Sequence, residues 1–107
     1  MLQLQGVAPT RIDNPGRLKS ALNAVVDDLG LTRVSEHSHY FVPGVSAVII
    51  LSESHLSVHT WPELEYMHVD LLTCVEKLKG ADLERTLRRT FQPAELNMVR
   101  LDYTNRS

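Results

Sequence analysis

The most constraining feature of this sequence is a pair of strand-like segments joined by three polar residues. Residues 45–51 (VSAVIIL) are rich in β-branched side chains and predict a strand inside a sheet. Residues 55–61 (HLSVHTW) alternate strictly, so one face carries Leu56, Val58 and Thr60 and the other carries histidines and a tryptophan. Because the link between the segments is so short, the two strands are expected to pair antiparallel.

The rest of the chain supplies further elements. We expect strands at residues 2–4, 34–41, 66–73 and 96–103, a loop at 9–16, and helices at 17–29 and 80–91. The first helix has apolar residues at spacings of three and four, with Gly30 at the position of a C-terminal cap. This order predicts an α+β fold, a two-layer α/β sandwich in which two helices cover one face of an antiparallel sheet.

Length and composition limit the possible classes of protein. A chain of 107 residues predicts a single domain, residues 1–107, too small for a deep private cleft, so a site at a subunit interface is expected. A net charge of −2 without a basic stripe argues against nucleic-acid binding. No apolar run is long enough to span a bilayer, so no membrane association is expected. The single cysteine, Cys74, suits a reducing compartment and predicts a cytoplasmic protein.

Four polar residues stand around the link between the two central strands. Ser54 ends the link, His59 follows on the polar face, Ser46 lies on the strand before and Cys74 ends the strand after. If neighbouring strands pair in sequence, a hydroxyl, an imidazole and a thiol can converge at one end of the sheet. These groups carry nucleophilic and acid–base chemistry. The alternative is a turn-forming serine, a solvated histidine and a buried structural cysteine.

Two other kinds of site have less support. His37, His39, His55 and His59 could supply imidazoles to a metal, but their spacing is not that of a zinc site, so no metal is expected. A serine hydrolase would need a Gly-x-Ser-x-Gly elbow, which Ser54 lacks.

Two runs of the sequence resemble one known family. Residues 44–63 (GVSAVIILSESHLSVHTWPE) and 69–74 (VDLLTC) are similar to the prokaryotic S-adenosylmethionine decarboxylases. The flanking helices also fall where that family has them, so the resemblance spans most of the chain.

The resemblance implies a self-processing enzyme. The family cuts its chain before the serine of Glu-Ser-His, here between Glu53 and Ser54. The cut gives a β chain, 1–53, and an α chain, 54–107. Ser54 becomes a pyruvoyl group that forms a Schiff base with the substrate, so neither pyridoxal phosphate nor a metal is expected.

The resemblance also assigns roles to other residues. Ser46 and His59 match residues that assist processing, with His59 transferring a proton, and Cys74 matches the proton donor of the decarboxylation. Phe41 matches an aromatic that stacks on adenine, and Glu63 matches the acid that binds ribose. The family's dimer predicts a homodimer with its sites near the interface.

The substrate is where the chain departs from the family. Glu65-Tyr66-Met67-His68 stands where the family usually has Gly-Tyr-Ala-Ala, and Leu72 and Val75 replace an aromatic and a glycine. S-adenosylmethionine, in polyamine synthesis, is the favoured small-molecule substrate. Relatives that decarboxylate arginine or ornithine are the alternative, since Glu65 could pair with a cationic side chain. A non-catalytic regulatory relative is the remaining possibility.

Overall fold

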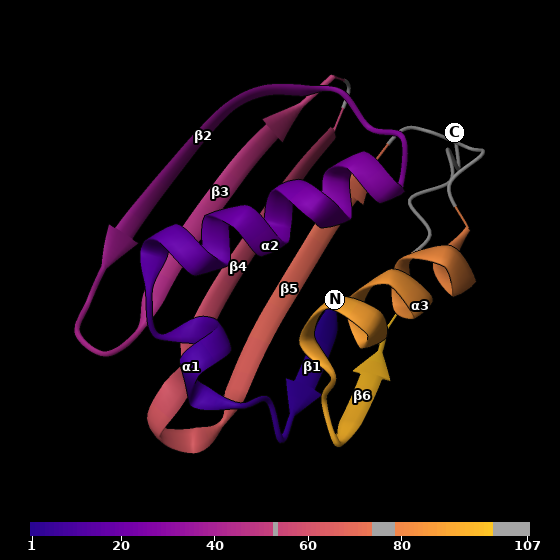
Figure 1. Ribbon diagram of the computed structural model, residues 1–107. Coiled ribbons are helices and arrows are strands. Elements are labelled where there is room, and N and C mark those ends of the chain that lie inside the picture. The colour runs from indigo at the N-terminus through magenta and orange to yellow at the C-terminus, as the bar shows by residue number, and fades with distance from the viewer. Residues whose placement is uncertain (53, 74–78, 100–107) are drawn as a thin grey trace, which may run out of the picture.

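A computed structural model describes residues 1–52, 54–73 and 79–99 as one sheet with helices packed on it (Figure 1). The strands are β1 (Leu2–Gln5), β2 (Arg33–Tyr40), β3 (Val45–Leu51), β4 (Ser54–Trp61), β5 (Tyr66–Thr73) and β6 (Glu95–Met98). The helices are α1 (Pro9–Ile12), α2 (Pro15–Asp28) and α3 (Gly80–Phe91), and a 3-10 turn, η1, covers Pro62–Leu64.

The sheet has six strands in the order β2-β3-β4-β5-β1-β6, and every neighbouring pair is antiparallel. The four strands that follow one another in sequence also lie side by side, as expected from their short links. β1 enters between β5 and β6 (Figure 1). The α+β sandwich with an antiparallel sheet is confirmed.

One face of the sheet is buried under the helices and the opposite face is open. α2 lies along β3, β4 and β5 and contacts α3, so both long helices cover the same face (Figure 1). The alternation predicted for residues 55–61 is confirmed, because Leu56, Val58 and Thr60 are buried while the odd-numbered residues face the other way. The largest fully buried side chains are those of Phe91, Leu2, Leu4, Ile12, Leu18, Leu22, Ile49, Met67 and Leu87.

Two predicted boundaries are wrong. Residues 9–16 were expected to form a loop, but they hold α1 and the start of α2. Proline favours the first position of a helix as well as a turn, and Asn14 caps α2 by accepting a hydrogen bond from the Arg17 amide at 3.1 Å. The last strand was expected to run over 96–103, but β6 ends at Met98, and residues 100–103 lie outside the described part.

The two long helices are joined by a polar contact. The Thr86 hydroxyl of α3 donates to the Asp28 carboxylate at the end of α2 at 2.6 Å, and Arg89 forms an ion pair with the same carboxylate. The hydrogen bond from Thr86, assisted by Arg89, holds the pKa of Asp28 below its usual value. Gly30 follows with a φ of 69°, which lets the chain leave α2 towards β2 as predicted.

Candidate active site

The open face of the sheet carries a hydrogen-bonded serine–histidine pair. Ser46 on β3 lies directly opposite His59 on β4, and Ser46 Oγ is 2.7 Å from His59 Nδ1. Both side chains are half-buried. If Nδ1 donates its hydrogen to Ser46, then Nε2 is the ring nitrogen that can accept a proton. The pair is therefore arranged as a positioned base.

A buried threonine fixes the strand that carries His59. The Thr60 hydroxyl accepts from the Val45 amide at 2.9 Å and donates to the Ile12 carbonyl, also at 2.9 Å. Thr60 is 5% exposed, so these bonds are shielded from water. They tie β3, β4 and the end of α1 together next to the Ser46–His59 pair. The sequence placed Thr60 on the buried face of β4, but gave no sign of its partners.

Ser54 lies at the other end of β4. It pairs with Leu51 on one side and with Thr73 on the other. Its Oγ is buried and has no hydrogen-bond partner among the described residues. A buried hydroxyl without a partner is unusual in a folded protein and often marks a functional group.

The expected convergence of these residues at one end of the sheet is wrong for a single chain. Ser54 and His59 are five residues apart on one strand, which separates them by about 16 Å. The odd spacing also puts their side chains on opposite faces, since Ser54 shares the parity of Leu56. Antiparallel pairing then places Ser46 beside His59 and away from Ser54.

Two of the predicted site residues lie outside the described part of the chain. They are Glu53, which precedes the predicted cut, and Cys74, the predicted proton donor. Cys74 directly follows Thr73, the residue that pairs with Ser54 in the sheet. The chain therefore leaves β5 at the Ser54 end of the sheet, and not at the His59 end.

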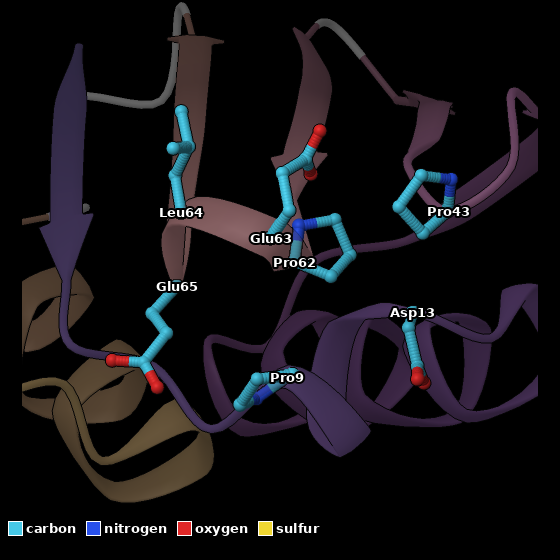
Figure 2. A pocket seen from close by; sticks show the side chains of 7 residues that line it. All are labelled: Pro9, Asp13, Pro43, Pro62, Glu63, Leu64 and Glu65. Carbon is cyan, nitrogen blue, oxygen red and sulfur yellow. The ribbon is translucent and has the colours of Figure 1, made fainter.

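The predicted substrate-binding residues lie at the His59 end. Glu63 and Glu65 line a surface pocket, together with Pro9, Asp13, Pro43, Pro62 and Leu64. Figure 2 shows the two glutamate carboxylates pointing in opposite directions. Phe41 does not line this pocket. It is 63% exposed in the turn between β2 and β3, with its ring centroid 4.3 Å from that of His39.

The sequence analysis missed a second polar pair on the open face. His68 on β5 lies directly opposite His59, and its Nε2 is 3.0 Å from Asp70 Oδ2. The alternation of Tyr66, His68 and Asp70 along the predicted strand was a usable signal. This alternation was overlooked because residues 66–73 also contain several apolar side chains and therefore resemble a mainly apolar strand.

Neither a metal cluster nor a membrane span is visible in the described ranges. No three His, Cys, Asp or Glu side chains in those ranges are placed to share a metal ion. None of the helices described has the length and apolar character needed to cross a bilayer.

Comparison with known proteins gives one consistent result. A family model described as S-adenosylmethionine decarboxylase matches residues 1–104. An S-adenosylmethionine decarboxylase proenzyme of Methanococcus maripaludis is 38% identical over 101 residues, which are 92% of this chain and 82% of that protein. One from Persephonella marina is 35% identical over 98 residues, 91% of this chain and 74% of that protein.

One solved structure has a similar fold. The crystal structure of the adenosylmethionine decarboxylase from Aquifex aeolicus superposes with a TM-score of 0.81 at 27% sequence identity. The match covers 97% of this chain and 92% of that one.

Proposed function

The chain belongs to the S-adenosylmethionine decarboxylase family, and from this premise we propose that it cuts itself between Glu53 and Ser54 and then decarboxylates S-adenosylmethionine. It is a pyruvoyl-dependent carboxy-lyase of polyamine synthesis, made as a proenzyme. The cut divides the single domain into residues 1–53 and 54–107. The observation that carries the assignment of the cut is the buried Ser54 hydroxyl, which has no partner among the described residues.

Processing begins with the Ser54 hydroxyl. Its Oγ attacks the carbonyl carbon of Glu53, and the peptide bond is exchanged for an ester. A base then removes the Cα hydrogen of Ser54, the ester C–O bond breaks, and the carboxylate of Glu53 leaves. Hydrolysis of the resulting enamine releases ammonia. A hydroxyl that is not bonded to another group is available for the first step, which is why the buried Oγ fits a precursor of the pyruvoyl group.

The pyruvoyl group supplies a carbonyl that withdraws the electron pair released when carbon dioxide departs. The remaining tasks belong to the chain itself. His59, held through Nδ1 by Ser46, is the base for the elimination, and Cys74 is the proton donor of the decarboxylation. We assign Glu63 the role of ribose acceptor and Phe41 that of an aromatic surface for adenine, as the family resemblance implies.

A homodimer would shorten the separation between Ser54 and a His59 along the strand direction. The open face carries exposed apolar side chains, with Ile50 at 39%, Leu72 at 48% and Trp61 at 40% exposure. A second copy packed on this face would cover them. A two-fold axis that runs between the two sheets and passes over the middle of β4 would put the partner's His59 at the Ser54 end of the strand, on the open face and therefore opposite to the Ser54 side chain.

The composite site can be tested by complementation. Ser54→Ala retains His59, and His59→Gln retains Ser54, so each protein alone should stay uncut. Coexpressed, they should form heterodimers in which the chain carrying His59→Gln is cut. Absence of any cut chain in a mixture whose heterodimer is seen by native mass spectrometry would place both residues in one subunit.

The cut and the substrate need separate measurements. Intact-mass analysis should find residues 1–53 and a pyruvoyl-capped chain from position 54, with Ser38→Ala, on the exposed edge strand β2, as an equally cut control. A carbon dioxide release assay then compares S-adenosylmethionine, arginine and ornithine. Turnover of arginine or ornithine alone would assign Glu65 to the cationic side chain of that substrate. We place the enzyme in the cytoplasm, because a single cysteine suits a reducing compartment.

A further inference from the structure

His39 lies beside the aromatic side chain that we assign to adenine, and the reaction described above does not use it. Its ring centroid is 4.3 Å from that of Phe41, and the two ring planes are inclined by 53°. A tilted arrangement at such short range is that of an attractive aromatic pair. No other ring in the described ranges pairs with Phe41. The contact is therefore a specific feature of the turn between β2 and β3.

The backbone of this turn is fixed independently of the His39 ring. The Phe41 amide donates to the Gly44 carbonyl at 2.6 Å. Gly44 packs so closely on β4 that a β-carbon at this position would lie 2.6 Å from the Thr60 carbonyl oxygen, so only glycine fits there. These contacts hold the path of the chain but leave the direction of the Phe41 side chain free, because that side chain is mostly exposed.

His39 is held by the sheet. It lies on β2 directly opposite Ser46 of β3, so its side chain is on the open face with Ser46 and His59. A ring carried by a paired strand moves less than a ring carried by a turn. His39 is therefore the fixed member of the aromatic pair, and Phe41 is the member whose orientation the contact selects.

We infer that His39 is a positioning residue for substrate binding, which holds the ring of Phe41 in the orientation that stacks on adenine. This inference rests on the proposed function of Phe41 as the adenine surface. An exposed side chain samples about three χ1 rotamers. If one of them can stack on the base, a ring freed from His39 is competent about a third of the time, and the apparent affinity falls about threefold. Self-cleavage does not use this ring, so its rate should not change.

The test is the steady-state kinetics of carbon dioxide release from S-adenosylmethionine by the self-cleaved enzyme. His39→Gln, which removes the ring, should raise KM about threefold with kcat unchanged. His39→Phe, which keeps an aromatic ring on the same strand position, should have a KM near that of the wild type. His37→Gln is the matched control and should leave KM unchanged. His37 is exposed on the same face of β2, opposite Val48, and has no ring partner among the described residues.

A double variant shows whether His39 acts through Phe41. Phe41→Leu loses the stacking surface and should raise KM about tenfold, a typical effect of losing one base–aromatic stack. Combined with His39→Gln, it should have the same KM as Phe41→Leu alone, because the ring that His39 orients is gone. A double variant in which the two single effects multiply would overturn the inference, since His39 would then contact the substrate itself.

The outcomes separate this inference from the proposed function. An unchanged KM in His39→Gln beside a raised KM in Phe41→Leu would overturn the inference while the role of Phe41 stands. A His39→Gln chain that is cut more slowly than the wild type would assign His39 to the Ser46–His59 pair and would also overturn it. A wild-type chain that is never cut, or that turns over arginine and not S-adenosylmethionine, would overturn the proposed function and this inference with it.

Discussion

The substitution Ser54→Ala should make the uncut precursor more stable while it abolishes cleavage. The Ser54 hydroxyl oxygen is buried without a partner among the described residues. A buried polar group without a hydrogen bond costs about 1–3 kcal/mol, whereas alanine removes a single oxygen and leaves the β-carbon in place. Allowing for the lost packing of that oxygen, we expect a gain of about 1 kcal/mol in the free energy of unfolding.

This gain is large enough to measure as a melting temperature. Unfolding entropy is about 2.1 cal/mol/K per residue, so for a chain of this length 1 kcal/mol raises the Tm by about 4 °C. Both proteins must be uncut, so the comparison is made in a His59→Gln background with and without Ser54→Ala. Urea unfolding at one protein concentration gives the same difference independently.

A fall in the melting temperature would contradict this expectation. A Tm that falls by more than about 2 °C on Ser54→Ala would mean that the hydroxyl stabilises the precursor, and that it is not held ready for attack. Ser38→Ala, at an exposed position of β2, is the control and should change stability by less than about 0.5 kcal/mol. Cleavage of a Ser54→Ala chain would refute the assignment of the nucleophile altogether.

Three further substitutions test hydrogen bonds made by Thr60, Ser46 and Asp28. Thr60→Val should lower the free energy of unfolding by about 2–3 kcal/mol in urea titration, because two buried backbone groups lose their partner and valine has the same shape. Ser46→Ala should slow self-cleavage about tenfold in pulse–chase gels, with unchanged Tm, because His59 loses the group that fixes its ring. The lowered pKa of Asp28 means that its bond to Thr86 stabilises the folded state above the usual carboxyl pKa of 3.8 and that this contribution is lost as the pH falls. Asp28→Asn should therefore be less stable than wild type at pH 7 in thermal melts, and the difference should narrow below about pH 4.

Most of the fold was predictable because its elements are encoded locally. The strand bounds of 45–51 and 66–73 and the helix bounds of 80–91 agree with the structure, since alternation and helical periodicity are short-range signals. The prediction failed at 9–16, where proline and asparagine serve equally well in turns and at helix starts. It also failed to see that β1 separates β5 from β6, because strand order is a long-range property.

For the candidate site, too, some features followed from the sequence and others only from the structure. The residues proposed to carry the chemistry came from the sequence alone, because Glu53, Ser54 and His59 stand in a run whose chemical types match one family. The expected convergence of Ser54 and His59 was wrong within one chain, since five residues of a strand span about 16 Å and change face.

Only the tertiary structure decided which partners these residues have. Register paired Ser46 with His59 and put His68 beside them, and burial left the Ser54 hydroxyl without a partner among the described residues. Cross-strand contacts depend on how distant segments align, and burial depends on what packs above them. Neither quantity is present in the order of residues along one strand, so the proposed cut between Glu53 and Ser54 could be named from the sequence, but the burial of the Ser54 hydroxyl could not.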